Sequence, residues 1–431
     1  MQSEYSLTKM PTLQSDLEND YVELKSDNST LGTTIRHHYR QTNSFVNLSD
    51  SYFEINFHVT GGIASETLVN HVGSLFRRAT LKIGSVTVEQ IENLNHVLLV
   101  SSMLKYSNDY AQSSGSNLFY YHDTGNEAGI NVLPLAGAAA VADARDANVN
   151  PAYNSGYRQR LARTSVATAA NVGQVISCRV ALHEIFQFAS VDKVMFGQEF
   201  ETELVRSPKE EFLIGLVAGG PAATPAEVVI DKVSIWVNKR VPDRETELAF
   251  LGSISAGLNY DYNFLYQTGY LTGGLQQGSN QLRITTQSEK LISAFVMLVP
   301  AAFQQWVSKT ASVDELESAE IILNNVRYPV RKYEDLKLEA GKARCYHALT
   351  HMLTGGDLQS GIGLTFDEYK RSTVIPFNFS AQQNLTGGPS VIELNVTLAA
   401  AGNGSRAIVV LVSEKTVMMS YAGTSAVVTI M

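Results

Sequence analysis

The sequence predicts an all-β fold of two tandem sandwich-like halves, each with a short helix. Three observations support this prediction: hydrophobic and polar residues alternate in many short segments, helical patterns are few, and one order of strands, hairpin and helix occurs twice along the 431 residues. Hydrophobic residues make up 44% of the chain, which is enough to fill folded cores and argues against a disordered protein.

The first half contains the clearest alternation. Residues 52–59 place four apolar side chains on one face of a strand, because successive side chains of a strand point to opposite faces. Two apolar runs, 80–83 and 86–88, flank Gly84-Ser85 and predict a hairpin. The other predicted strands of this half are 175–182, 201–204 and 228–237.

The second half repeats this style. Its predicted strands are rich in aliphatic residues and comprise 292–299, 321–323, 374–379, 392–398 and 408–412. Helical spacing of apolar residues occurs at 88–104 in the first half and at 333–353 in the second, although Gly341 weakens the latter pattern. A third, short helix is expected at 243–251, where Asp243 is in a suitable position to cap the first turn.

The two halves echo each other in spacing. Ile55 precedes Phe295 by 240 positions, and the hairpin at 81–86 precedes the segment 321–326 by the same distance. Each hairpin leads into a helical segment, a polar stretch and closing strands. Apolar and polar residues alternate in many β proteins, so the similarity between the two halves could also arise by chance. The pattern nevertheless favours an internal duplication.

The halves are unequal in length between matching elements. The segment from Leu104 to Val175 spans 71 positions, whereas its counterpart from Leu353 to Val374 spans 21. The connection before the last strand of the first half spans 24 positions, whereas its counterpart in the second half spans 9. Long loops at one end of a sandwich usually carry external contacts. The expected organisation is a polar arm at 1–30, a first unit at 31–242 with long loops at 105–171 and 205–227, a linker at 243–257, and a second unit at 258–431.

Composition argues against two classes of partner. The net charge is −9 and no run of Lys and Arg exceeds two residues, so sequence-specific binding of nucleic acid is not expected. No apolar run reaches the roughly 18 residues that a membrane-spanning helix needs. Residues 1–31 are polar and acidic, so we expect no signal peptide and synthesis inside a cell. The two cysteines, Cys178 and Cys345, are expected to be free and buried.

Two histidine pairs are the candidates for a metal site. His37 and His38 are adjacent on a predicted strand, where they point to opposite faces and cannot readily share an ion. His347 and His351 have the i, i+4 spacing of a zinc-binding helix, but the intervening residues lack the glutamate of a zincin motif. We therefore expect exposed or packed histidines and no metal-ligating residue.

Three alternating carboxylates, Glu199, Glu201 and Glu203, share one face of a predicted strand. Their oxygen atoms could hold calcium, which prefers oxygen ligands. The simpler interpretation is a solvated strand face that discourages wrong edge pairing. We expect the second arrangement.

Two further groups of residues could suggest a chemical site. Residues 272–275 contain a glycine pair, but they lack the lysine and the spacing of a phosphate-binding loop, so a turn is expected. Cys345 and His347 are two residues apart on a predicted helix, where side chains do not face each other, so a catalytic thiol is not expected. The sequence assigns no catalytic or cofactor-binding residue, and we expect no enzyme and no cofactor.

The duplicated strand order, the helix after the third and fourth strands of each half and the large first-half insertion are similar to the double jelly-roll major capsid proteins of tailless double-stranded DNA viruses. The similarity is greatest to the polinton-like virus, adintovirus and virophage branch and covers roughly residues 31–431. The segment 150–160, with Gly156-Tyr157-Arg158-Gln159-Arg160, resembles a loop segment common in those capsid proteins.

This resemblance implies a double jelly roll, in which each half is an eight-stranded sandwich. It implies a major capsid protein, located in the virion, that forms homotrimers. Each trimer would be a pseudo-hexagonal capsomer that tiles an icosahedral shell beside neighbouring capsomers, penton proteins and minor capsid proteins. The long first-half loops would face outward, and the arm at 1–30 would lie at the base.

Two other functions fit a duplicated sandwich. A jelly-roll carbohydrate-binding or spike-type attachment protein would need a concave face with clustered aromatic residues. A bicupin-type metalloenzyme would need His-x-His, a following glutamate and a third histidine in each half, a set that this sequence lacks.

Overall fold

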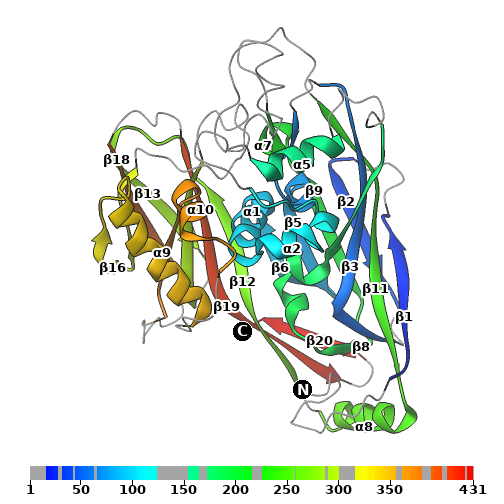
Figure 1. Cartoon of the computed structure of the whole chain (residues 1–431). Helices are drawn as coiled ribbons and strands as arrows, with labels where there is room; N and C mark the ends of the chain where they lie inside the picture. Colours follow the sequence, from blue (N-terminus) through cyan, green and yellow to red (C-terminus); the bar gives the residue numbers. More distant parts are fainter. Residues whose placement is uncertain are drawn as a thin grey trace.

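The protein is described by a computed structural model. The described residues are 16–27, 32–41, 44–62, 66–123, 154–164, 171, 173–215, 226–257, 259–286, 290–299, 316–355, 362–380, 390–399, 405–422 and 425–430. Two β-rich halves lie side by side, the first coloured blue to green and the second green to red (Figure 1).

The first half contains two facing antiparallel sheets. One sheet has the order β1-β11-β3-β7, with β8 also paired to β3, and the other has the order β2-β9-β5-β6. Two short strands, β4 and β10, pair separately. The strands are β1 (Asp16–Lys25), β2 (Thr34–Tyr39), β3 (Phe45–Thr60), β4 (Thr67–Leu68), β5 (Phe76–Ile83), β6 (Val86–Glu92), β7 (Ile176–Ala181), β8 (Val194–Phe196), β9 (Phe200–Arg206), β10 (Leu213–Ile214) and β11 (Glu227–Pro242).

The second half repeats this arrangement. One sheet has the order β12-β19-β14-β17, with β20 also paired to β19, and the other has the order β13-β18-β15-β16. The strands are β12 (Tyr260–Leu271), β13 (Gly278–Thr286), β14 (Leu291–Val299), β15 (Leu316–Leu323), β16 (Val326–Tyr333), β17 (Val374–Asn378), β18 (Ser390–Leu398), β19 (Arg406–Ala422) and β20 (Ser425–Ile430).

The strand orders of the two halves match one for one. Numbering the eight shared strands of each half along the chain gives the sheets 1-8-3-6 and 2-7-4-5 in both halves. Two four-stranded antiparallel sheets with this connectivity form a jelly roll. The expected all-β double jelly roll of two tandem eight-stranded sandwiches is therefore confirmed, and Ile55 and Phe295 lie on the equivalent strands β3 and β14.

Helices are short and lie between strands. α1 (Leu94–Lys105) follows β6, and its equivalent α9 (Glu339–Thr354) follows β16, so each half has a helix at the same point of the jelly roll. The other α-helices are α2 (Asn108–Gln112), α5 (Ser155–Thr164), α6 (Leu182–Ile185), α7 (Lys209–Phe212), α8 (Arg244–Ser255) and α10 (Phe366–Arg371). Short 3-10 turns are η1 (Val72–Leu75), η2 (Gly115–Leu118) and η4 (Gln187–Ser190).

The expected helix bounds need correction in two places. Residues 88–92 belong to β6, because their backbone pairs with β5, and the helix begins only after Asn93, which has φ 50°. In the second half, Tyr333 ends β16 and the helix begins at Glu339. Gly341 is accommodated for a steric reason, because an added Cβ would lie 2.3 Å from the carbonyl oxygen of Asp335.

The expected segment at 243–251 does form a helix. α8 spans Arg244–Ser255, and the side chain of Asp243 accepts a hydrogen bond from the backbone N–H of Thr246. This helix occupies the expected linker between the two jelly rolls.

The expected arm at 1–30 is wrong for residues 16–25. They form β1, the edge strand of the first sheet, which pairs with β11 over nine residue pairs. This polar segment has no clear alternation of apolar and polar residues. Its backbone N–H and C=O groups become part of a strand by pairing with β11. The expected loop at 105–171 also contains α2, η2 and α5, and the expected loop at 205–227 contains α7 and β10. Residues 1–15, 124–153 and 216–225 lie outside the described residues.

Burial explains which strands alternate strictly. β3 alternates over residues 51–60 because one face lines the sandwich core and the other is partly exposed. Along β14 every residue from Ser293 to Val299 is buried, and Ala407 to Ser413 of β19 are buried as well. Because residues on both faces of this sheet are buried, another part of the protein must pack against its outer face.

Candidate functional site: the junction and the outer surfaces

The cover on the second-half sheet is α1 of the first half. Its N-cap Asn93 donates a side-chain hydrogen bond to the carbonyl oxygen of Gly269 on β12, at 2.9 Å. A Cβ added at Gly269 would lie 2.8 Å from Cγ2 of Val97 and 3.1 Å from the carbonyl oxygen of Glu92. Gly269 therefore allows the close approach of the two halves at this contact.

Two side chains of the second half donate hydrogen bonds to backbone carbonyl oxygens of β6 in the first half. The Tyr266 hydroxyl donates to the carbonyl oxygen of Gln90, and the Lys415 ammonium donates to the carbonyl oxygen of Val88. Farther along β12, the ring of Tyr262 lies 5.0 Å from the ring of Phe188 in η4. The junction thus combines apolar packing with hydrogen bonds to strand backbone.

A buried carboxyl group lies on β6, the strand whose backbone Tyr266 and Lys415 contact. Glu89 of β6 is fully buried and accepts hydrogen bonds from the backbone N–H groups of Gln187 and Phe188, both at 3.0 Å. Burial raises the pKa of Glu89 to about 7, although the two hydrogen bonds and the Lys415 charge oppose this effect. Glu89 consequently titrates near neutral pH.

The first-half insertion is fixed by a buried arginine. Arg160 of α5 has no exposed surface and donates to Oδ1 of Asn70 at 2.6 Å and to Oδ1 of Asp123 at 3.0 Å. Gly156 makes room for this contact, since an added Cβ would lie 2.7 Å from the carbonyl oxygens of Tyr121 and His122. The Gly156–Arg160 motif seen in the sequence therefore has a structural role within the described residues.

A hydrogen bond between His122 and Glu368 joins the insertion to the second half. Nε2 of His122, a residue that is 4% exposed, donates to Oε1 of Glu368 at 2.8 Å. Glu368 also accepts hydrogen bonds from the backbone and hydroxyl of Thr365 in a capping box at the start of α10. Burial alone would raise the pKa of Glu368, but the hydrogen bonds from His122 and Thr365 outweigh it and lower the pKa to about 2.

We expect Glu368 to make the protein sensitive to acid. A carboxyl whose pKa is lower in the folded state stabilises it above pH 4.5, and this contribution disappears as the pH falls toward 2. Glu368→Gln should lower the free energy of unfolding at pH 7 by about 2 kcal/mol and weaken its loss between pH 4.5 and 2. Urea unfolding at several pH values measures both effects. The control is Asp367→Asn, whose carboxylate is 71% exposed; equal acid sensitivity of Glu368→Gln and wild type would contradict the expectation.

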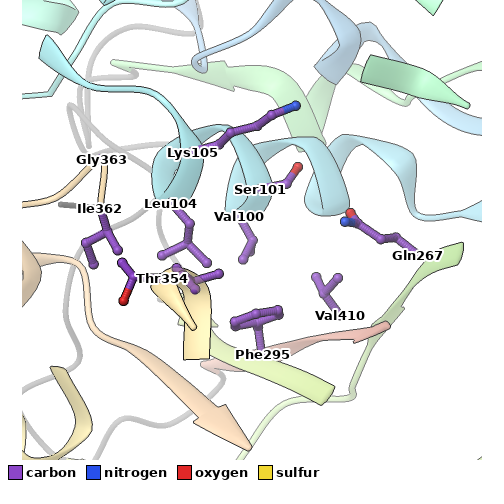
Figure 2. Close-up of a pocket in the computed structure, with 11 residues that line it drawn as sticks. Val100, Ser101, Leu104, Lys105, Gln267, Phe295, Thr354, Ile362, Gly363 and Val410 are labelled. Carbon is purple, nitrogen blue, oxygen red and sulfur yellow. The ribbon is translucent and has the colours of Figure 1, made fainter. Parts of the chain in front are cut away.

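A pocket of about 320 Å³ remains between α1 and the second-half sheet. Figure 2 shows Val100 and Leu104 of α1 facing Phe295 and Val410 across it, while Lys105 points away. The hydroxyl of Ser101, which also lines the pocket, donates to its own helix at the carbonyl oxygen of Val97. The described lining is mostly apolar and offers no charged group directed into the pocket.

The two adjacent histidines point to opposite faces, as expected. His37 is buried, with Nε2 3.0 Å from the carbonyl oxygen of Val233. Nδ1 of His38 lies 2.9 Å from Asp27, and its Nε2 lies 3.0 Å from Glu201. The structure does not bring the two imidazoles together.

The acidic strand is neutralised by neighbouring cations. Glu201 pairs with Lys82 at 3.4 Å, besides His38. Glu203 pairs with Arg36 and Arg78, at 2.8 and 2.9 Å. Glu199 precedes β9 and is exposed. The expected solvated edge strand is therefore wrong: β9 lies between β2 and β5, and the Glu201 and Glu203 side chains are only 19% and 12% exposed because their ion pairs lie within the sheet.

The remaining candidates also occupy structural positions. His347 and His351 are exposed on α9, and Cys178 and Cys345 are free and buried. In the loop after β12, the backbone N–H of Ala407 donates to the hydroxyl of Thr272. Among the described residues there is no cluster of three or more potential metal ligands. In the same part of the chain, no helix is long and apolar enough to cross a membrane.

An aromatic patch on the outer face of the first sheet was not predicted from the sequence. Tyr21 of β1 lies 5.7 Å from Tyr52 of β3, which stacks on Trp236 of β11 at 6.3 Å. The guanidinium of Arg179 lies 5.5 Å from the Tyr52 ring. The signal in the sequence was Trp236, which takes an outward position in a strand whose Ile235 and Val237 face the core.

The far side of the second half presents another distinctive surface. β16 is an edge strand whose Val330 is 92% exposed and whose Val326 is 51% exposed. Arg331 and Lys332 beside them are also exposed, with 82% and 45% of their side-chain surfaces accessible. Isolated exposed apolar residues are common, but two on one edge strand mark a candidate contact surface.

Comparison with known proteins identifies the fold. No protein-family model matches the chain, and no curated protein matches its sequence. A chain of the Sputnik virophage structure matches over 99% of this chain and 91% of its own, with 10% identity and a TM-score of 0.61. The mavirus major capsid protein covers 98% and 92%, with 9% identity and a TM-score of 0.52, and a chain of the PBCV-1 virus capsid covers 98% of both, with 9% identity and a TM-score of 0.55. At these identities the likeness is one of fold, and it confirms the resemblance to double jelly-roll capsid proteins.

Proposed function

We propose that this double jelly-roll chain is a major capsid protein that assembles into homotrimeric, pseudo-hexagonal capsomers of an icosahedral virus shell. The observation that supports it most strongly is the one-for-one repeat of eight strands in each half. Three chains with two equivalent sandwiches each would present six similar walls, which is the symmetry that a hexagonal lattice needs. The likeness in fold to viral capsid proteins over nearly the whole chain supports the same role.

In this role the protein is located in the virion and has no catalytic activity. Its partners are copies of itself, neighbouring capsomers, and penton and minor capsid proteins. Paired carboxylates, separated histidines and buried thiols support a structural role for the residues that could have carried chemistry.

The test is the mass and packing of the purified chain. Analytical ultracentrifugation should give a particle of three chains, and electron microscopy at high protein concentration should show flat hexagonal arrays. A stable monomer that binds glycans on an array would contradict the capsid assignment and support a carbohydrate-binding or attachment protein.

A further inference from the structure

The pocket between α1 and the second-half sheet is lined by well-buried apolar side chains from both halves. Its volume is about 320 Å³. Val100 and Leu104 of α1 lie on one side of it, and Phe295 of β14 and Val410 of β19 lie on the other (Figure 2). These four side chains are between 1% and 9% exposed. An apolar cavity of this size is within the range of small-molecule binding sites.

Backbone contacts at both ends of α1 keep the pocket open. Near the start of the helix, Asn93 bonds to Gly269, where the absence of a side chain lets β12 approach closely. At the other end, the backbone N–H of Gly363 donates to the carbonyl oxygen of Leu104 at 3.0 Å, and an added Cβ at Gly363 would lie 2.6 Å from the carbonyl oxygen of Tyr106. Because α1 is held at both ends, it closes the pocket only partly when the space is empty.

The polar side chains of the lining differ in their capacity to bind a ligand. The hydroxyl of Ser101 donates to the carbonyl oxygen of Val97 at 2.7 Å. The hydroxyl of Thr354 donates to the carbonyl oxygen of Thr350 at 2.8 Å. The side-chain amide of Gln267 has no partner among the described residues, and Figure 2 shows it directed from β12 toward α1. Gln267 therefore offers a free donor and a free acceptor to a ligand.

The charge of the lining excludes an ionised ligand. Lys105 points away from the pocket (Figure 2) and pairs with Glu184 at 3.3 Å. A charge buried among apolar side chains without a partner is costly, whereas an uncharged polar group needs only a hydrogen bond. Leu353 at the rim is 41% exposed, so the pocket is reached from solvent on that side.

The volume of the pocket limits the size of its ligand. A group the size of a water molecule takes about 30 Å³, so there is room for roughly ten such groups. We propose that the pocket binds an uncharged, single-chain aliphatic molecule of about this size, with its chain between α1 and the sheet β12-β19-β14 and its polar head on the Gln267 amide. The bound molecule bridges the two jelly rolls. The site lies within one chain, so binding does not depend on the proposed capsomer.

A series of straight-chain alcohols tests the size of the site. Isothermal titration calorimetry of the purified chain should show one decan-1-ol bound per chain. Each methylene removed should weaken binding about fourfold, so octan-1-ol should bind roughly 15-fold more weakly. Dodecan-1-ol should bind no more tightly than decan-1-ol, because the pocket is already full. No saturable binding, or an affinity that keeps rising beyond decan-1-ol, overturns the proposal.

The contact with Gln267 is tested separately. Decanoate, the charged analogue, should bind at least about tenfold more weakly than decan-1-ol. Gln267→Leu should weaken decan-1-ol binding about fivefold, through the loss of one hydrogen bond, and leave the dependence on chain length unchanged. The matched control is Gln159→Leu at an exposed position of α5, which should bind as wild type does. Equal affinity for decanoate and decan-1-ol, or wild-type affinity of Gln267→Leu, overturns the assigned head-group contact.

Filling the pocket gives an independent readout. Val100→Phe should abolish decan-1-ol binding, because the ring occupies the space that the ligand needs. Its melting temperature should stay close to that of wild type, since the added atoms enter an existing cavity. The same substitution at Val175, which is 53% exposed, should leave binding unchanged. A folded Val100→Phe variant that binds decan-1-ol as tightly as wild type overturns the site, and the alcohol series and Gln267→Leu decide the question without this variant.

Discussion

Arg160→Ala is expected to destabilise the protein by about 3–5 kcal/mol, because it removes one partner of a buried ion pair. The guanidinium has no exposed surface and connects Asn70, Asp123 and the carbonyl oxygen of Tyr121. Without it, the Asp123 carboxylate, which is 13% exposed, loses its cation. The melting temperature should fall by roughly 5 °C in a thermal unfolding scan.

Two variants separate this effect from a general effect of mutating α5. Gln159→Ala changes the preceding, exposed residue and should alter stability by less than about 0.5 kcal/mol. Arg160→Lys keeps the charge but loses the planar fork that reaches two acceptors, so its stability should lie between Arg160→Ala and wild type. A melting temperature of Arg160→Ala equal to that of Gln159→Ala would show that the cluster contributes little.

The second large effect is a loss of stability as the pH rises, caused by Glu89. Its pKa is about 7 in the folded protein, against an ordinary value of 4.5. Between these values the folded state binds more protons than the unfolded state, so the free energy of unfolding falls as the pH rises from 4.5 through 7. The difference corresponds to about 3 kcal/mol between pH 4.5 and pH 8.

Glu89→Gln should remove this contribution, because an amide does not titrate in this range. Its unfolding free energy in urea should vary less between pH 5 and pH 8 than that of wild type. The variant loses one of the two backbone hydrogen bonds from Gln187 and Phe188, so it should be less stable than wild type at pH 5. Glu199→Gln, at an exposed carboxyl near β9, serves as the control. Equal pH profiles for Glu89→Gln and wild type would contradict the assignment.

Alternation in the sequence was a reliable guide wherever one face of a strand lines a core. The segment 52–59 and the hairpin around Gly84-Ser85 lie where they were expected. Spacing between the halves also identified equivalent strands such as β3 and β14. These features could be predicted because side-chain direction in a strand depends on the sequence position alone.

Prediction was wrong where a neighbour in space decides the structure. The acidic segment of β1 has no core pattern and becomes a strand by pairing with β11, more than 200 positions away. Residues 88–92 have apolar residues at helical spacing, yet their pairing with β5 makes them a strand. Local propensity is overridden in both places by long-range hydrogen bonding.

The candidate functional residues also separate into those that the sequence predicts and those that only the tertiary structure brings together. The sequence by itself determined that the chain is a duplicated all-β protein and that its two adjacent histidines face apart. Only the tertiary structure decided that His122 meets Glu368 across 246 positions, that Glu89 is buried between the halves, and that Tyr21, Tyr52 and Trp236 form one patch. Periodicity reports which way a side chain points from its own strand, whereas the partners of that side chain depend on which strands the fold brings beside it.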